Sequence, residues 1–508
     1  MDEIEREIVK LAETYKKPNE FICELEKLPI PLDKKDNFFF YTGIILCKFS
    51  YFFLALNIWD HALKYFIKNG NKSGELACIG NIGTTYGNLG DFKKAIEYFE
   101  KSLEIAKEIE DRVGELFFCM NLGNTYATLG DFRKAIDYYK NSLEISKKFE
   151  DRVGELRCCT NLAHVYYCLK DFRKAIEYLE KSLDVAEEIE DRVGELTCYG
   201  NLGLICCCLE DFRKAMNYYE KSLEIAKEIG DKAAESSCLI DLAHIYHKLG
   251  DFRKAIEYFE KSLEIAKKIE DRVGESKIHG DLGNVYRRLG DFGKAMNYYE
   301  KSLEIAEEIQ DKDLKRIGYL NIGLTYSNSR KFRKAIDYYK KSLKIAKETG
   351  DKKEELLYYG DLYAAYHNLG NLRKAVEYRE KSLKITKEIE DKSAELSCLI
   401  DLGNMYHDLR DFGKAIEYLE ESLEIAGEIE DKVGKLSCYG NIGEVYATLG
   451  DSKKAINYYE KSLEIAKEIG DKAAESRCYT GLGNVYSSLG DFKKAINYYE
   501  ISLKIAKE

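Results

Sequence analysis

Apolar side chains recur at helical spacing along most of this chain, and the pattern returns every forty residues. After Asp111, an apolar residue stands at every third or fourth position as far as Leu129, which predicts an amphipathic helix. A second apolar stripe, from Phe132 to Ile145, predicts a second and longer helix before Asp151 restarts the cycle. Each forty-residue unit is therefore expected to be a helix-turn-helix.

The residues between the stripes fit the ends of these helices. Asp111 and Asp131 stand where an N-cap carboxylate accepts a hydrogen bond from the first helical turn. Gly130 is placed to take the left-handed conformation that ends a helix. We therefore predict two helices per unit, with boundaries at these positions.

From Asn81 onward the units follow one another without insertion or deletion until the last one stops at Glu508. A fixed period of this length indicates stacked repeats, each packed on its neighbours. An alanine column that begins at Ala95 and a leucine column that begins at Leu103 suit close packing between helices. We expect one elongated array.

Three segments are predicted. Residues 1–33 carry all three prolines and form an N-terminal helical segment. Residues 34–73 form a degenerate capping repeat, because Gly43 and Ala55 stand where later repeats place Gly83 and Ala95. Residues 74–508 form eleven repeats, the last without a capping helix after it.

The apolar stretch from Phe38 to Trp59 is long enough to suggest a membrane span. Lys48 stands in its middle and its spacing follows the repeat, so we favour a buried repeat and regard membrane contact as the alternative. No basic region followed by a short apolar core and a cleavage site is visible at the N-terminus. A cytoplasmic protein is expected.

Composition narrows the classes of function. A net charge of −11 argues against general binding to nucleic acid phosphates. Many of the fifteen cysteines fall in one repeat column, so they lie too far apart for disulfides and are expected to be reduced core residues. Paired CxxC motifs are absent from the sequence, and we expect neither a metal site nor a cofactor.

The pattern formed by Leu122, Gly123, Tyr126, Ala135 and Tyr139 resembles the tetratricopeptide repeat, and it recurs in eleven copies. The forty-residue period most resembles Pins-type adaptors and kinesin light chains. The resemblance implies an all-α fold, a right-handed superhelical solenoid of stacked helix-turn-helix repeats. It also implies that the first helices line a concave face.

One polar column stands on those first helices, with Asn or Asp in ten repeats and Gly481 in the last. Related arrays use such an asparagine ladder to hydrogen-bond the main chain of an extended peptide. The alternative is that these side chains only satisfy the array itself. With the neighbours that would select side chains, the predicted peptide-binding residues are Asn81, Asn121, Asn124, Asn161, His164, Asn201, Asp241, His244, Asp281, Asn284, Arg287, Asn321, Asp361, Asp401, Asn404 and Asn441.

One repeat departs from the pattern. Tyr363 replaces a close-packing glycine and Arg379 replaces a core aromatic residue, so we expect Tyr363 to push two helices apart. The preceding repeat is locally basic. A bend or a specialised pocket near 321–380 and simple sequence drift are the two explanations.

The chain is interpreted as a non-catalytic interaction module for a protein or peptide partner. His244 and His247 share a helix with Asp241, but the sequence supplies no nucleophile or phosphate loop beside them. The alternative is a self-associating scaffold. Its basis is the last helix, where an apolar layer would remain poorly covered at Ile496, Tyr499, Leu503 and Ile505.

Overall fold

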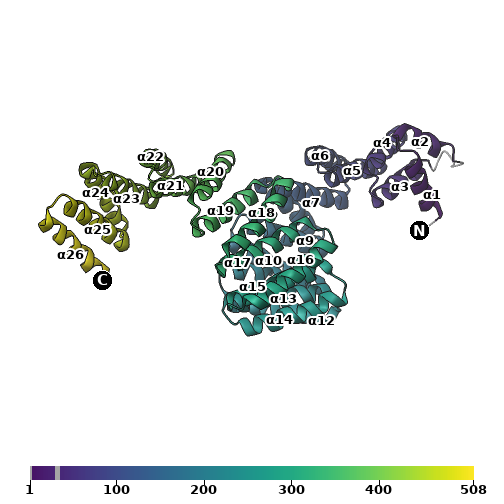
Figure 1. The fold of residues 1–508 in the computed structure, drawn as a ribbon. Helices are drawn as coiled ribbons and strands as arrows, with labels where there is room; N and C mark the ends of the chain where they lie inside the picture. Colours follow the sequence, from purple (N-terminus) through teal and green to yellow (C-terminus); the bar gives the residue numbers. More distant parts are fainter. Residues whose placement is uncertain (1–2, 29–34, 508) are drawn as a thin grey trace. The chain divides into compact units, whose positions relative to one another are not determined.

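A computed structural model describes residues 3–28 and 35–507, which form 26 α-helices and no strand. The chain divides into two compact units, and the boundary in the sequence lies between Leu249 and Gly250. Within each unit, helices that follow one another in the chain pack as pairs, and the pairs stack in order (Figure 1). The all-α helix-turn-helix fold expected from the sequence is therefore confirmed.

The first unit holds the N-terminal helices and the repeats up to Leu249. Its helices are α1 (Glu3–Thr14), α2 (Pro18–Glu26), α3 (Lys35–Lys48), α4 (Phe52–Lys68), α5 (Lys72–Asn88), α6 (Phe92–Glu108), α7 (Arg112–Thr128), α8 (Phe132–Lys148), α9 (Arg152–Cys168), α10 (Phe172–Glu188), α11 (Arg192–Cys208), α12 (Phe212–Ile229) and α13 (Lys232–Lys248).

The second unit begins at Gly250. Its helices are α14 (Phe252–Lys268), α15 (Arg272–Arg288), α16 (Phe292–Glu308), α17 (Lys312–Asn328), α18 (Phe332–Thr349), α19 (Lys352–Asn368), α20 (Leu372–Glu388), α21 (Lys392–Asp408), α22 (Phe412–Glu428), α23 (Lys432–Thr448), α24 (Ser452–Ile469), α25 (Lys472–Ser488) and α26 (Phe492–Lys507).

The predicted helix ends are confirmed at the caps. The Asp111 carboxylate accepts a hydrogen bond from the Gly114 amide at 3.0 Å, and Asp131 accepts one from Lys134 at 3.2 Å. The prediction of a longer second helix is wrong, because α7 and α8 both have 17 residues. Gly130 ends α7 with a φ of 79°, and Glu150 takes a φ of 55° just after α8, so both helices stop in the same way.

A glycine and an aromatic ring hold the two helices of a repeat close together. A Cβ atom on Gly123 of α7 would lie 2.6 Å from the ring of Tyr139 on α8, closer than real Cβ atoms come. Ala135 is fully buried one turn earlier, and the Ser142 hydroxyl donates to the carbonyl of Leu116 at 3.3 Å. The pair therefore packs closely through small residues and is joined by interhelical hydrogen bonds.

The cysteine column lies where one repeat meets the next. The Sγ atom of Cys438 on α23 is 2.9 Å from the hydroxyl of Ser422 on α22, and Cys478 contacts Ser462 in the same way at 3.3 Å. Burial raises the pKa of the Cys438 thiol to about 11, although the hydrogen bond to Ser422 opposes the shift. These cysteines are small core residues in the thiol form.

The N-terminal apolar stretch is broken into two helices. Ser50 takes a φ of 64° between α3 and α4, and the Trp59 ring packs so close to Gly43 that a Cβ there would lie 2.3 Å from it. Among the helices that the structure describes, none has the length and apolar character needed to cross a bilayer. Residues 38–59 therefore do not form the single helix that the alternative requires.

The N-terminal segment covers this first helix pair. Ile8 of α1 and Phe21 of α2 are buried in one apolar cluster with Ile58 of α4. The predicted boundary near residue 33 lies outside the described residues, and the three-segment division stays a prediction.

First helices of neighbouring repeats contact each other directly. These contacts join α7 to α9 and α9 to α11 in the first unit, and α15 to α17, α21 to α23 and α23 to α25 in the second. Residues in one column of the first helices are therefore brought side by side. We call this surface of each unit the first-helix face.

The glycine–aromatic contact predicts a difference between two glycines of the first unit. Gly123→Ala forces the Tyr139 ring to move and should lower stability by about 1–3 kcal/mol. Gly200→Ala meets nothing nearer than 3.9 Å and should be neutral or stabilising, because alanine favours helix. Thermal unfolding of both variants measures this, and equal effects would contradict the packing described.

Candidate functional site

The predicted ladder residues occupy equivalent places on the first-helix face. Every asparagine and aspartate of the column is partly buried, and Gly481 on α25 is fully buried. In the first unit the Nδ2 group of Asn161 reaches Oδ1 of Asn124 in the preceding repeat at 3.5 Å. Asn161 of the column thus lies close to Asn124, one of the neighbouring residues predicted for the same site.

Five of the asparagines keep their amide groups unengaged. Within residues 3–28 and 35–507, no side-chain hydrogen bond reaches the amide of Asn81, Asn121, Asn201, Asn321 or Asn441. An amide side chain offers two donors and one acceptor oxygen. The side-chain amides of these five asparagines therefore have no hydrogen-bond partner among the described residues.

The neighbouring asparagines serve the array itself. The Tyr139 hydroxyl donates to Oδ1 of Asn124 at 2.6 Å, and the Tyr299 hydroxyl donates to Oδ1 of Asn284 at 2.8 Å. Arg287 donates through Nε to the Tyr299 hydroxyl at 3.2 Å. The side-chain oxygens of Asn124 and Asn284 and the Nε group of Arg287 are therefore engaged within the array, as the alternative interpretation expects. They hold the tyrosine that packs on the glycine of the same repeat.

Partial burial changes the chemistry of the acidic rungs. It raises the pKa of Asp241 and of Asp361 to about 6, and that of Asp281 to about 7. Oδ2 of Asp361 is buried and has no hydrogen-bond partner among the described residues. Below these pKa values the carboxyl group is protonated and has both a donor and an acceptor, as an amide does.

His244 lies on α13, one turn after Asp241, and is partly buried. Burial lowers the pKa of its imidazole, and the charge of Lys248 acts in the same direction. The ring is therefore neutral at pH 7, with one donor and one acceptor nitrogen. In the described part of the chain, no group of three or more His, Cys, Asp or Glu side chains is arranged to hold a metal ion.

Arg379, which departs from the repeat pattern, forms an ion pair within the array. The guanidinium of Arg379 lies 4.8 Å from the centre of the Tyr363 ring, in the place where other repeats pack an aromatic residue on glycine. Its Nη2 atom reaches Oδ2 of Asp401 at 2.5 Å and the Ser397 hydroxyl at 3.0 Å. Asp401 is therefore already paired, so it is a weaker candidate for ligand contact than the sequence suggested.

Two predicted residues line a pocket of about 520 Å³ on the first-helix face of the second unit. Asn404 of α21 and Asn441 of α23 meet there with Arg477 of α25, and Tyr459 of α24 lies among the lining residues. Gly481 makes room for the Tyr459 ring, because a Cβ would lie 2.7 Å from it. The pocket thus combines amides, an exposed cation and a small-residue floor.

A second pocket, of about 130 Å³, lies on the first-helix face of the first unit. It includes His164 and Asn201 from the predicted set. Its other lining residues, which the sequence analysis missed, are Ala163, Tyr167, Leu179, Leu204 and Ile205. The signal was present in the sequence, since Ala163 and Leu179 depart from the usual glycine and aromatic residue.

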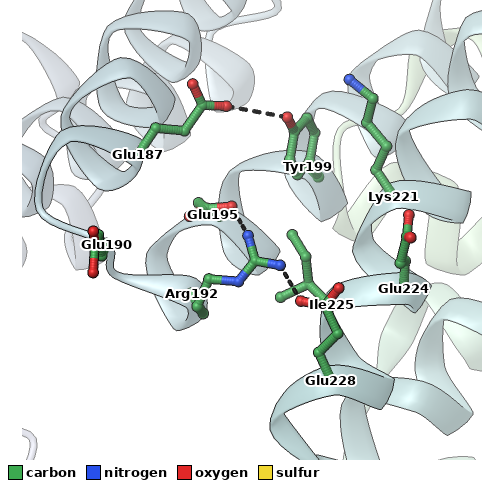
Figure 2. Close-up of a pocket in the computed structure, with 9 residues that line it drawn as sticks. All are labelled: Glu187, Glu190, Arg192, Glu195, Tyr199, Lys221, Glu224, Ile225 and Glu228. Atoms are coloured by element: carbon green, nitrogen blue, oxygen red, sulfur yellow. Dashed lines mark hydrogen bonds and ion pairs between the residues drawn. The ribbon is translucent and has the colours of Figure 1, made fainter.

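The pocket in Figure 2, of about 620 Å³, is of another kind. Arg192 bridges Glu195 at 2.5 Å and Glu228 on α12, and the Tyr199 hydroxyl donates to Glu187 at 3.3 Å. The same pair of ion pairs recurs in other repeats, for example where Arg152 contacts Glu155 and Glu188. A periodic ion pair of this kind stabilises the junction and is not a distinctive site.

Comparison with known families identifies the repeat. The tetratricopeptide repeat model matches residues 43–108, 116–188, 156–228, 196–268, 234–308, 274–348, 314–388, 354–428 and 430–508. The sequence has no match among curated proteins.

Solved structures share the helix-pair fold at low identity. The apo form of RapI is 19% identical, with a TM-score of 0.51 over 70% of this chain and 98% of that one. A signal transduction ATPase with a tetratricopeptide repeat sensor, from Pyrococcus horikoshii, is 20% identical, with a TM-score of 0.49 over 69% of this chain. This chain spans about half of that ATPase, 52% of its length.

Because Asp361 is partly buried, we expect Asp361→Asn to raise the stability of the folded state by an amount that depends on pH. The pKa of Asp361 rises from 3.8 to about 6 on folding, so the folded state loses stability as the pH rises through that interval. The variant should therefore gain up to about 3 kcal/mol at pH 8 and almost nothing at pH 4. Thermal unfolding at both pH values measures this, with the exposed Asp337→Asn of α18 as the control. A gain that is equal at both pH values would contradict it.

Proposed function

Since this chain belongs to the tetratricopeptide repeat family, we propose that it is a non-catalytic protein-interaction module that holds a peptide segment of a partner protein on its first-helix face. The Asn/Asp ladder contacts the main chain of that segment, and neighbouring side chains select its residues. Arrays of this family serve as protein-interaction scaffolds, and the peptide and the ladder are the specific parts of the proposal.

One observation carries the proposal. Residues of the predicted set line two pockets on the first-helix face, Asn404 and Asn441 in the second unit and His164 and Asn201 in the first. A ligand site typically combines a concavity with a few convergent polar groups. The pocket around Arg192 is lined by no asparagine or glutamine, and Arg192 itself is paired with Glu195 and Glu228.

The chemistry of the rungs suits a peptide main chain. Each non-proline residue of a peptide presents one N–H donor and one C=O acceptor, and an amide side chain can answer both. The free rungs of the first unit, such as Asn121 and Asn201, supply this pairing. Binding through main-chain groups would tolerate many sequences, so selectivity would come from the pockets.

The helices that carry the rungs are also formed before binding. Each lies on a helix whose N-terminus is capped, as Asp111 caps α7 and Asp191 caps α11. Preorganised polar groups lose little conformational entropy when a ligand arrives, which favours affinity. The proposed mechanism is therefore positioning, with little rearrangement of the helices.

The ladder is tested with a library of random peptides displayed on phage and selected on the purified chain. Replacing Asn121, Asn161 and Asn201 together by alanine should lower the affinity of selected peptides by about tenfold or more, since several hydrogen bonds are lost. Titration calorimetry with the selected peptides gives the affinities.

The matched control replaces Asn141 of α8 and Asn217 of α12, two exposed asparagines on second helices. This variant should bind as the natural chain does. If both variants bind alike, or if the library yields no binder to the natural chain, the peptide groove is wrong.

A second candidate function, self-association, rests on the outer face of α26. Phe492, Ile496 and Leu503 are exposed there by 65%, 57% and 56%. Tyr499 is exposed as predicted, but the expectation for Ile505 is wrong, because that side chain is partly buried in the last apolar cluster. Exposed apolar patches of this kind mark interaction surfaces.

If two copies pair through this face, sedimentation should show a dimer whose dissociation constant rises about tenfold or more in Ile496→Glu/Leu503→Glu, since a buried charge opposes association. Glu500→Gln, an exposed polar change on the same helix, is the control. A monomer at every concentration would exclude this function and leave the groove untouched.

A further inference from the structure

We propose that the cavity between α9, α10 and α11 is a selective pocket for one apolar side chain, of leucine to phenylalanine size, in the peptide bound to the first-helix face. This inference rests on the proposed function and adds the residue class that the first unit selects. It arises from one local departure from the repeat pattern, at Ala163 and Leu179.

In most repeats the corresponding space is filled. The Tyr139 ring lies against Gly123, and the Tyr219 ring lies 2.9 Å from where a Cβ on Gly203 would stand. The Tyr139 hydroxyl extends beyond the ring and reaches Asn124 on the first-helix face. An aromatic side chain in this place therefore fills the gap between the two helices out to the surface.

The repeat at 161–200 leaves part of this space empty. Leu179 is shorter than tyrosine, and it faces Ala163 instead of glycine. The repeat with Gly403 shows how leucine packs on glycine, because a Cβ there would lie 2.5 Å from Cγ of Leu419. Ala163 carries that Cβ, so Leu179 cannot settle in the same way and a cavity remains beside it.

The size of the cavity defines what it can hold. Its volume is about 130 Å³. Apolar cavities of about 150 Å³ stay dry and bind benzene, so this one suits a branched aliphatic chain or a single six-membered ring. Ala163, Leu179 and Ile205 are buried apolar residues of its wall. Against this apolar wall, a charged or strongly polar side chain would lose its hydration without gaining a partner.

The rim of the cavity lies on the proposed path of the peptide. Asn201 lines it, and Asn161 stands two residues before Ala163 on the same helix. Leu204 is 42% exposed and His164 is exposed, so the cavity is bordered by side chains that solvent reaches. A peptide whose main chain is held by Asn161 and Asn201 would thus present a side chain to the opening.

The test fills the cavity without touching the rungs. Leu179→Phe produces the alanine–phenylalanine combination that this chain carries at Ala243 and Phe259. Ala163→Gly/Leu179→Tyr, as a second variant, restores the common pair of the other repeats. Both changes use combinations that the fold already accommodates, and circular dichroism with thermal unfolding verifies that each variant is folded.

The probe is the same phage-displayed library of random peptides, selected on the natural chain and on both filled variants. We expect peptides selected on the natural chain to share one apolar position. Filling the cavity should weaken them about 10–100-fold, the range that corresponds to burial of one such side chain. Changing that position to alanine should weaken binding to the natural chain alone and not to the filled variants.

The outcomes separate this inference from the proposed function. Peptides that lose affinity with Asn161→Ala/Asn201→Ala but bind the filled variants unchanged would overturn the pocket and leave the groove standing. Peptides that are indifferent to both sets of changes would overturn both. An invariant position occupied by a charged or polar residue would also contradict the apolar pocket.

Discussion

The packing of an aromatic ring against a glycine of the partner helix is the contact on which this structure depends. It sets how closely the two helices of a repeat approach, because any side chain at Gly123 or Gly283 would collide with the tyrosine opposite. The same tyrosines reach the first-helix face, where Tyr139 and Tyr299 bind Asn124 and Asn284. In these repeats one contact thus joins the core to the candidate binding surface.

This coupling means that changes in the core also change the surface. Where Ala163 and Leu179 replace the pair, a cavity opens beside Asn201. Where Tyr363 and Arg379 replace it, a cation is brought to the ladder and neutralises Asp401. In the proposed mode of binding, the uniform repeats would supply length and repeated main-chain contacts, and the irregular repeats would distinguish one ligand from another.

The sequence predicted what depends on period and on local rules: the helix pairs, the aspartate caps and the family. The other features of the candidate site depend on distances and packing, which the sequence does not show. The pocket beside Leu179 depends on a methyl group of Ala163, and the pairing of Asp401 depends on how Arg379 folds across Tyr363. Helical periodicity fixes the face on which a residue lies, but not which neighbour it reaches, so the engaged and the free asparagines looked alike in the sequence.

The central claim is that free rung amides bind a peptide main chain, and the side-chain amide signals of the asparagines report on it most directly. We would record nitrogen–proton NMR spectra of the chain, with asparagine labelled, during titration with a peptide selected from the library. The account predicts that the Nδ2 signals of Asn121 and Asn201 shift and become protected from exchange, while those of Asn141 and Asn217 stay in place. Unchanged rung signals at saturating peptide would contradict it.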